Sequence, residues 1–144
     1  MTRVVSFSRR YRFSASHRLH VDHLTDEQNR ECFGKCNNPH GHGHNYILEV
    51  RVKGPVSDET GMVVNLVDLD AVVKQRVIDR FDLQNLNHDP LFATEVSSTE
   101  NLCKEVWQLL QENEAPQRLG SARLERVRLE ETENNFFEFA GKEN

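Results

Sequence analysis

The sequence contains no apolar run of the roughly 20 residues that a helix needs to cross a bilayer. Its first thirteen residues, MTRVVSFSRRYRF, carry positive charge but lack the apolar segment and the small-residue cleavage site of a secretory signal. We therefore expect a cytoplasmic protein with no membrane partner.

Cysteine is scarce. Only three are present, Cys32, Cys36 and Cys103, and an odd number in a chain without an export signal is typical of reduced thiols. We therefore expect reduced thiols rather than a disulfide framework, and a free thiol is then available for chemistry.

Positive charge is not in excess, since the sequence contains 18 Lys and Arg and 23 Asp and Glu, which gives a net charge of -5. This balance argues against a protein that follows a nucleic-acid backbone, although a local basic pocket for a small phosphorylated ligand is compatible with it. The 144 residues suit a single domain spanning 1–144, with enough chain to bury a core.

The apolar pattern predicts four strands and two helices. Alternation predicts strands at residues 3–15 and 45–52 and two more around a turn at residues 133–135. Helical spacing predicts a helix at residues 67–79 and a second one that opens with a capping box at Ser97 and Glu100 and ends near residue 113. Residues 17–30 suit a loop or short helix. The order indicates an α+β domain, an antiparallel sheet with helices on one face.

The stretch ECFGKCNNPHGHGHNYILEV, residues 31–50, predicts a metal site. His42 and His44 are two residues apart, so in a strand both imidazoles point to the same face. A third ligand is needed, and the candidates are His17, His20, His23, His40 and His88. His17 stands out because it ends the first strand, where an antiparallel neighbour would bring it opposite the pair.

Two kinds of zinc site fit this pattern. Three imidazoles would leave one position open for a substrate, as in catalytic sites, whereas Cys36 as a fourth ligand would close a structural site. A histidine-rich surface that binds no metal is the third reading.

Five blocks of sequence together resemble the 6-pyruvoyl-tetrahydropterin synthase and 6-carboxy-tetrahydropterin synthase family: FSASHRL, FGKCNNPHGHGHNY, TGMVVNL, SSTEN and EETENN. The resemblance runs from about Phe13 to the end of the chain. It implies the tetrahydropterin-synthase fold, a four-stranded antiparallel sheet with two helices on one face. It also implies that three chains join their sheets into a barrel, that two trimers commonly form a homohexamer, and that the sites lie between subunits.

The resemblance also implies a chemistry. Zn2+ would be held by His17, His42 and His44, and Cys36 would act as a thiolate base rather than a ligand. The reaction would be that of a carbon–oxygen lyase in tetrahydrobiopterin biosynthesis, which converts 7,8-dihydroneopterin triphosphate to 6-pyruvoyl-tetrahydropterin with loss of triphosphate.

Three further residues gain a role from the resemblance. Glu131 would anchor the pterin ring, because a carboxylate can accept two hydrogen bonds from an amino-pyrimidine edge. Thr99 and Glu100 lie in the block that lines the pterin pocket, although both also suit the start of a helix.

The match fails in one place. The family carries an aspartate followed directly by a histidine that assists the cysteine, whereas the stretch FDLQNLNHDP keeps Asp82 but has Leu83 next. Leucine cannot relay a proton. One hypothesis is that His88 supplies the missing imidazole, and another is that the chain catalyses a related or slower reaction without it.

Two alternatives therefore stand beside the pyruvoyl reaction. The first is 6-carboxy-tetrahydropterin synthase of the deazapurine (queuosine) route, which uses the same substrate and releases acetaldehyde. The five residues NNPHG between Cys36 and His42 favour the pyruvoyl branch, although His40 offers a shorter gap. The second alternative is a non-catalytic protein that binds zinc and pterin.

Overall fold

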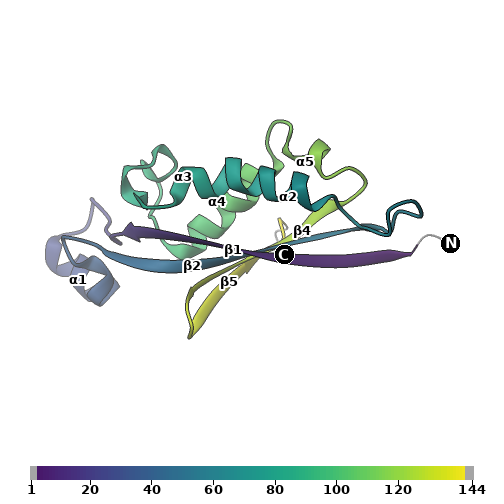
Figure 1. Cartoon of the computed structure of the whole chain (residues 1–144). Helices are drawn as coiled ribbons and strands as arrows, with labels where there is room; N and C mark the ends of the chain where they lie inside the picture. The colour runs from purple at the N-terminus through teal and green to yellow at the C-terminus, as the bar shows by residue number, and fades with distance from the viewer. Residues whose placement is uncertain (1–2, 142–144) are drawn as a thin grey trace.

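A computed structural model describes residues 3–141 and shows one twisted sheet with helices on one face (Figure 1). The strands lie in the order β3-β1-β2-β4-β5. Their bounds are β1 Val4–His17, β2 His42–Pro55, β3 Gln84–Asn85, β4 Arg123–Thr132 and β5 Asn135–Phe139. The predicted antiparallel order of the four long strands is confirmed, and the two-residue β3, which pairs parallel to β1, is an addition that the sequence pattern did not indicate.

The first two strands are longer than predicted and form one uninterrupted ladder. Val4 pairs with Pro55 at one end and His17 pairs with His42 at the other. Side chains alternate along both strands, and the inward set includes Phe13, Tyr46 and Leu48, all less than 5% exposed. The strand that was predicted at 45–52 therefore begins early enough to contain the two histidines of the GHGH motif.

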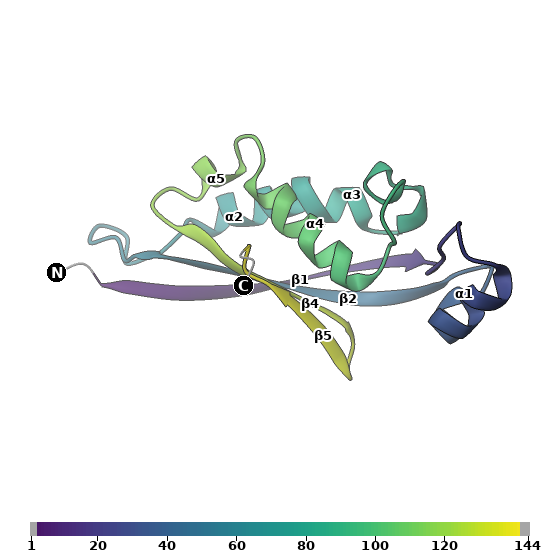
Figure 2. The ribbon, with the colours of Figure 1, turned by 180° about the vertical axis from the view of Figure 1, so that it is seen from behind.

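Two long helical segments cover the inner face of this sheet, as seen from both sides in Figures 1 and 2. The first comprises α2 (Leu66–Val73), a π-helical turn (Lys74–Ile78) and α3 (Asp79–Phe81), and the second is α4 (Thr99–Gln111). A short helix, α5 (Ala115–Arg118), leads into β4. The two predicted helices are confirmed in place.

The start of α4 differs from the prediction. The N-cap is Ser98, whose side chain accepts a hydrogen bond from the backbone N–H of Asn101 at 3.3 Å. The predicted capping box of Ser97 and Glu100 is therefore wrong by one residue, because two serines precede the helix and only the second has its hydroxyl at the open N–H groups. This shift frees Ser97 for another role, described below.

One wide helical turn keeps the first segment in contact with the sheet. A π turn carries more residues than an α turn and thus resets the helical phase. Val73, Val77 and Phe81, four residues apart through this turn, are all fully buried. The turn is braced by Arg76, whose Nε donates to the Leu109 carbonyl at 3.1 Å.

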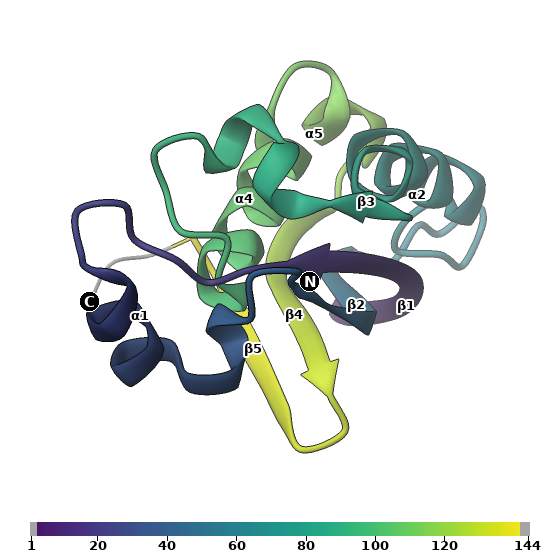
Figure 3. The same ribbon diagram turned by 90° about the vertical axis from the view of Figure 1, so that its left-hand side faces the viewer.

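Residues between β1 and β2 extend beyond one end of the sheet (Figures 1 and 2), and a view onto that end shows α1 (Asp26–Phe33) on the other side of the strands from α2 and α4 (Figure 3). They also contain a 3₁₀ helix at Gly34–Asn37. Thr25 caps α1 and forms a reciprocal capping box with Gln28. Of the two alternatives for residues 17–30, the short helix is observed over the second half. Further 3₁₀ turns at Leu86–His88 and Pro90–Phe92 follow β3.

None of the helices within residues 3–141 combines the length and the apolar character required to cross a membrane.

Candidate active site

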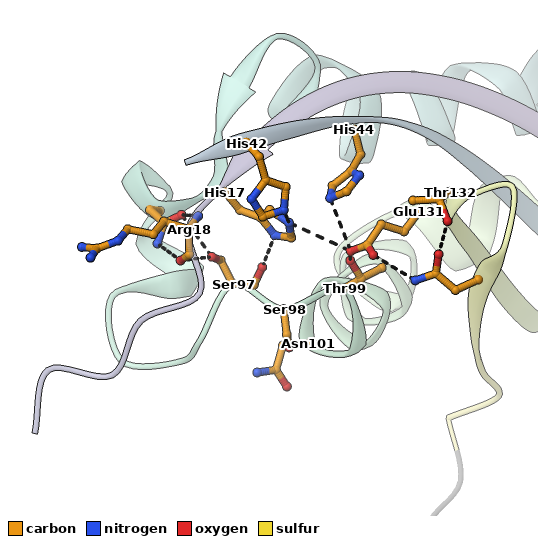
Figure 4. A network of polar contacts seen from close by, with 12 residues as sticks. His17, Arg18, His42, His44, Ser97, Ser98, Thr99, Asn101, Glu131 and Thr132 are labelled. Atoms are coloured by element: carbon orange, nitrogen blue, oxygen red, sulfur yellow. Dashed lines mark hydrogen bonds and ion pairs between the residues drawn. The ribbon is translucent and has the colours of Figure 1, made fainter. Parts of the chain in front are cut away.

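Three histidines meet at the end of the sheet where β1 stops and β2 starts. The ladder places His17 beside His42, and His44 two residues further along the same face of β2 (Figure 4). One ligand nitrogen from each of the three lies within 4.8 Å of the others. Among the described residues, this is the one group of three or more His, Cys, Asp or Glu side chains able to hold a metal ion.

A backbone carbonyl fixes the orientation of His17. Its Nδ1 lies 2.7 Å from the carbonyl oxygen of Ser97, and a carbonyl can only accept, so Nδ1 carries the proton. The lone pair of His17 is thereby assigned to Nε2, which faces the other two rings. Metal-binding histidines are commonly oriented by such a bond on the opposite ring nitrogen.

The spacing of the nitrogens suits a metal. The Nε2 atoms of His17 and His42 are 3.0 Å apart. Two nitrogens that bind one tetrahedral zinc ion at about 2.0–2.1 Å lie about 3.3 Å from each other. In addition, His44 Nε2 is buried and has no hydrogen-bond partner among residues 3–141. A metal ion would bind these three converging nitrogens and would give the buried Nε2 of His44 a partner.

Burial favours the neutral form of His17 and His44. His17 is 2% exposed, and this burial lowers its pKa below the ordinary value, with the two neighbouring rings adding to the effect. Burial also lowers the pKa of His44. Because a metal competes with protons for the same nitrogens, both shifts favour the form that binds metal.

Glu131 lies across from the histidines, at the end of β4. Its Oε2 is 3.8 Å from His44 Nε2 and 4.0 Å from His17 Nε2, and it accepts a hydrogen bond from the Thr99 hydroxyl (Figure 4). Its Oε1 accepts from the side-chain amide of Asn135 at 3.0 Å. Burial alone would raise the pKa of Glu131, but these hydrogen bonds and the nearby imidazoles outweigh it, so the pKa lies below the ordinary value. An ionised carboxylate therefore faces the histidine group.

Cys36 does not belong to the metal-capable group. It lies in the 3₁₀ helix at Gly34–Asn37, is partly exposed and is a free thiol. Its carbonyl accepts from the Leu19 N–H at 2.9 Å, which ties it to the segment that directly follows His17. The structure thus keeps the backbone of Cys36 near the end of β1 and does not place its sulfur among the three nitrogens.

Asp82 and Leu83 form a turn that is bonded to the edge of β1. Asp82 Oδ1 accepts from the Ser14 N–H at 2.9 Å, and the Leu83 N–H donates to the Ser14 carbonyl at 2.6 Å. Leu83 has a positive φ of 61° and is 82% exposed. A leucine in this conformation is unusual, since the left-handed region favours glycine, asparagine, aspartate and histidine.

The other predicted residues occupy different places. His88 is exposed on the 3₁₀ turn after β3 and lines a cavity that Leu83 does not touch. Glu100 is exposed in the first turn of α4. His20, His23 and His40, which were candidates for the third ligand, stay outside the metal-capable group.

Two contributors to the site were missed in the sequence. The Ser97 carbonyl orients His17, and Asn135, assigned only to a turn, holds Glu131. Backbone carbonyls leave no signal in a sequence, but an asparagine four residues after the candidate glutamate could have been noticed.

Comparisons with known proteins agree with one another. The profile of the family described as 6-pyruvoyl tetrahydropterin synthase matches residues 6–142. A human protein named 6-pyruvoyl tetrahydrobiopterin synthase is 45% identical over 136 residues, which cover 94% of this chain and 90% of the human one. The solved structure of 6-pyruvoyl tetrahydropterin synthase from Caenorhabditis elegans superposes with a TM-score of 0.87 at 38% identity, with 98% of each chain covered.

A relative with another name is more distant. A putative 6-carboxy-5,6,7,8-tetrahydropterin synthase from Archaeoglobus fulgidus is 33% identical over 97 residues, covering 67% of this chain and 73% of that protein. The extent of the profile match and the identity to the human relative, over nearly the whole of both chains, carry the conclusion: the chain belongs to the 6-pyruvoyl tetrahydropterin synthase family.

Proposed function

We propose that this chain is a zinc-dependent carbon–oxygen lyase that converts 7,8-dihydroneopterin triphosphate to 6-pyruvoyl-tetrahydropterin and releases triphosphate. The observation that carries the proposal is the convergence of His17, His42 and His44 opposite the ionised Glu131. Bound zinc would act as a Lewis acid that makes the carbon-bound protons of the substrate side chain more acidic.

The protein's own residues would bind the substrate and move the proton. Glu131, held by Thr99 and Asn135, retains lone pairs with which to accept hydrogen bonds from the aminopyrimidine edge of a pterin. Loss of triphosphate breaks a bond between carbon and a phosphate oxygen, so a proton must leave the adjacent carbon. We assign that step to the thiolate of Cys36, which can come close to the substrate because its 3₁₀ helix is tied to the end of β1.

Glu100 and His88 are further candidates for a role in this mechanism. Glu100 is exposed at the start of α4, one residue from Thr99, and would contact a pterin only at the rim of its pocket. His88 would supply the imidazole that Leu83 lacks. Because His88 lines a different cavity from Leu83, it would have to reach the substrate from another side.

We also propose that the sites are completed in a homo-oligomer, a trimer or hexamer. Within the described part of the chain, β1 has no neighbour on its outer side from Val4 to Phe13, and β5 pairs only with β4. Unpaired edges of this length are sites at which another chain can add strands. Asp82, bonded at that edge, would then lie close to a neighbouring chain.

Incubation of the zinc-loaded protein with 7,8-dihydroneopterin triphosphate tests the proposal. Mass analysis should identify 6-pyruvoyl-tetrahydropterin, and no acetaldehyde should form. Acetaldehyde together with a carboxylated pterin would assign the chain to the 6-carboxy branch instead. Binding of pterin and zinc without release of triphosphate would make it a non-catalytic member.

The greater similarity to relatives named for the pyruvoyl product supports the first outcome. The human relative is 45% identical over 94% of the chain, against 33% over 67% for the putative 6-carboxy relative.

A further inference from the structure

The chain has seven histidines, and the four outside the metal-capable group all line one cavity. The cavity has a volume of about 710 Å³ and lies between the segment after His17, the residues before His42 and the segment from β3 to α4. Its histidines are His20, His23, His40 and His88. Four imidazoles from three separate segments around one cavity indicate a site rather than scattered surface residues.

The cavity also presents defined N–H donors. The Nδ1 atom of His20 lies 3.1 Å from the side-chain amide of Asn37, which also donates to the Leu19 carbonyl, so Nδ1 accepts and Nε2 carries the proton. This Nε2 lies 3.8 Å from Asp22 Oδ1, and the exposed Asp22 would have to turn away for His20 to donate to a ligand. Arg18 uses its Nε to donate to the Asn37 carbonyl at 3.2 Å. This bond fixes the stem of Arg18, and no hydrogen bond or ion pair within residues 3–141 engages its terminal NH₂ groups.

The distribution of these groups discriminates between two kinds of ligand. A transition metal needs nitrogens that converge on one point, and within the described residues such convergence occurs only at His17, His42 and His44. Imidazole and guanidinium donors spread around a large cavity instead suit an extended anion with many acceptor oxygens. A polyphosphate chain has that chemistry.

Two carboxylates face the same cavity. Asp22 is fully exposed, whereas one oxygen of Glu95 is buried without a hydrogen-bond partner among the residues described. They would repel a bare anion. Polyphosphates, however, are bound together with Mg²⁺, which typically takes one or two protein carboxylates besides the phosphate oxygens. Glu95, as a residue of the cavity lining, could provide such a carboxylate through its other oxygen.

The cavity adjoins the active site through the backbone. Arg18 directly follows His17, His40 precedes His42 by two residues, and Ser97, which lines the cavity, orients His17 through its carbonyl. We propose that this cavity is a binding site for a magnesium polyphosphate. This polyphosphate is either the triphosphate of the substrate, which rests on the function proposed above, or a free polyphosphate.

Calorimetric titration with inorganic triphosphate and Mg²⁺ tests the site without any turnover. We use His42→Gln protein for the first titration, because it lacks a metal ligand and so removes binding through zinc. One triphosphate per chain should bind. No binding to this variant, with binding to the zinc-loaded protein, would overturn the proposal by assigning the anion to the zinc.

Variants of the exposed lining residues locate the site. The double variant His23→Phe/His88→Phe removes both ring N–H groups and should weaken triphosphate binding at least about tenfold, as expected for the loss of hydrogen bonds to a charged group. Arg18→Gln should have at least that effect, and Glu95→Gln should abolish the enhancement by Mg²⁺. Lys74→Gln, which removes a positive charge from the exposed surface of the π turn, should leave the affinity unchanged.

Equal weakening in Lys74→Gln and the cavity variants would reduce the effect to net charge and overturn the site. The proposal would also be overturned if the protein bound a second equivalent of zinc and the double histidine variant did not, because the cavity would then be a metal site.

Kinetics with the triphosphorylated pterin separate the two sources. A higher KM in the cavity variants would assign the site to the substrate's triphosphate. Weakened binding of inorganic triphosphate with an unchanged KM would assign it to a free polyphosphate. If the wild-type protein shows no turnover yet binds triphosphate in the cavity, the proposed reaction fails while the site stands. If it turns over and the cavity variants bind triphosphate normally, the reaction stands and the site fails.

Discussion

At the scale of single residues, the metal group rests on the convergence of three imidazoles. We expect His44→Gln to reduce bound zinc from one equivalent per chain to a small fraction, because a three-ligand site that loses one nitrogen binds weakly. Metal analysis after dialysis measures this. His23→Gln is the matched control, since His23 lies outside the group. Equal zinc content in the two variants would contradict the assignment.

Leu83 combines a strained backbone with a missing imidazole, and substitutions can separate the two. Leu83→Asn should stabilise the fold by up to about 1 kcal/mol, because asparagine accepts a φ of 61° more readily than leucine. Leu83→His should add to this a rise in kcat of about a hundredfold or more if an imidazole here acts in general acid–base catalysis. Urea unfolding and turnover measurements check the two effects. Equal kcat in both variants would show that no proton relay operates from this position.

The metal-capable group is the part of the site that the residue types and their spacing predicted. His42 and His44 were expected on one face of a strand, and His17 beside them, because alternation and antiparallel pairing follow from the sequence pattern. The Ser97 carbonyl, the hydrogen bonds of Glu131 and the separation of His88 from Leu83 depend on how distant loops pack, and no local pattern encodes them.

At the scale of elements, an ion pair with Arg80 of α3 anchors the segment between α3 and α4. Arg80 donates to both carboxylate oxygens of Asp89 at 2.8 and 2.9 Å, and Asp89 also accepts from the Leu91 N–H. Burial raises the pKa of Asp89, but these bonds outweigh it, so its pKa lies below the ordinary value.

This lowered pKa predicts a pH-dependent contribution to stability. The unfolded chain binds the proton more readily than the folded one, so the contribution is complete above the unfolded pKa of about 3.9 and is lost as the pH falls through the lower folded value. Asp89→Asn should therefore cost about 1–2 kcal/mol at pH 7, and less below pH of about 4. Urea unfolding at several pH values tests this. Asp79→Asn, which breaks an exposed pair with Lys74, should change little; a loss of equal size there would refute the special role of Asp89.

Element boundaries show where sequence reasoning ends. The helix at residues 67–79 was predicted correctly because Leu69, Val72, Val73 and Val77 recur at helical spacing. The π turn within it was not predicted, since a spacing of four suits both α and π geometry. β3 was missed because two residues cannot show a period.

At the scale of the whole molecule, assembly is the main prediction. We expect light scattering to give about 50 or about 100 kDa, three or six chains of 16.7 kDa. A monomer at micromolar concentration would contradict the interpretation of the open edges. That the 144 residues form a single domain also stays a prediction.

Mixed oligomers test whether neighbouring chains share a site. Cys36→Ser and Asp82→Asn are each expected to be inactive, and the asparagine can still accept the Ser14 N–H bond. If Cys36 and Asp82 of one site come from different chains, co-expression should restore about a quarter of the sites by random mixing. If both come from one chain, activity stays absent, and the proposal of shared sites fails.

The pairing of His17 with His42 has a further consequence. The 24 residues between them leave the ladder and return to it at the same rung, so their length and sequence are independent of the sheet's register. This segment contains Cys36 and three of the four cavity histidines, whereas the metal-capable group lies at its two ends. Evolution, or a protein engineer, can therefore exchange the middle of this segment and alter base and ligand preference together, provided that its ends are kept, because Gly41 has a φ of 75° and closely approaches the His17 carbonyl.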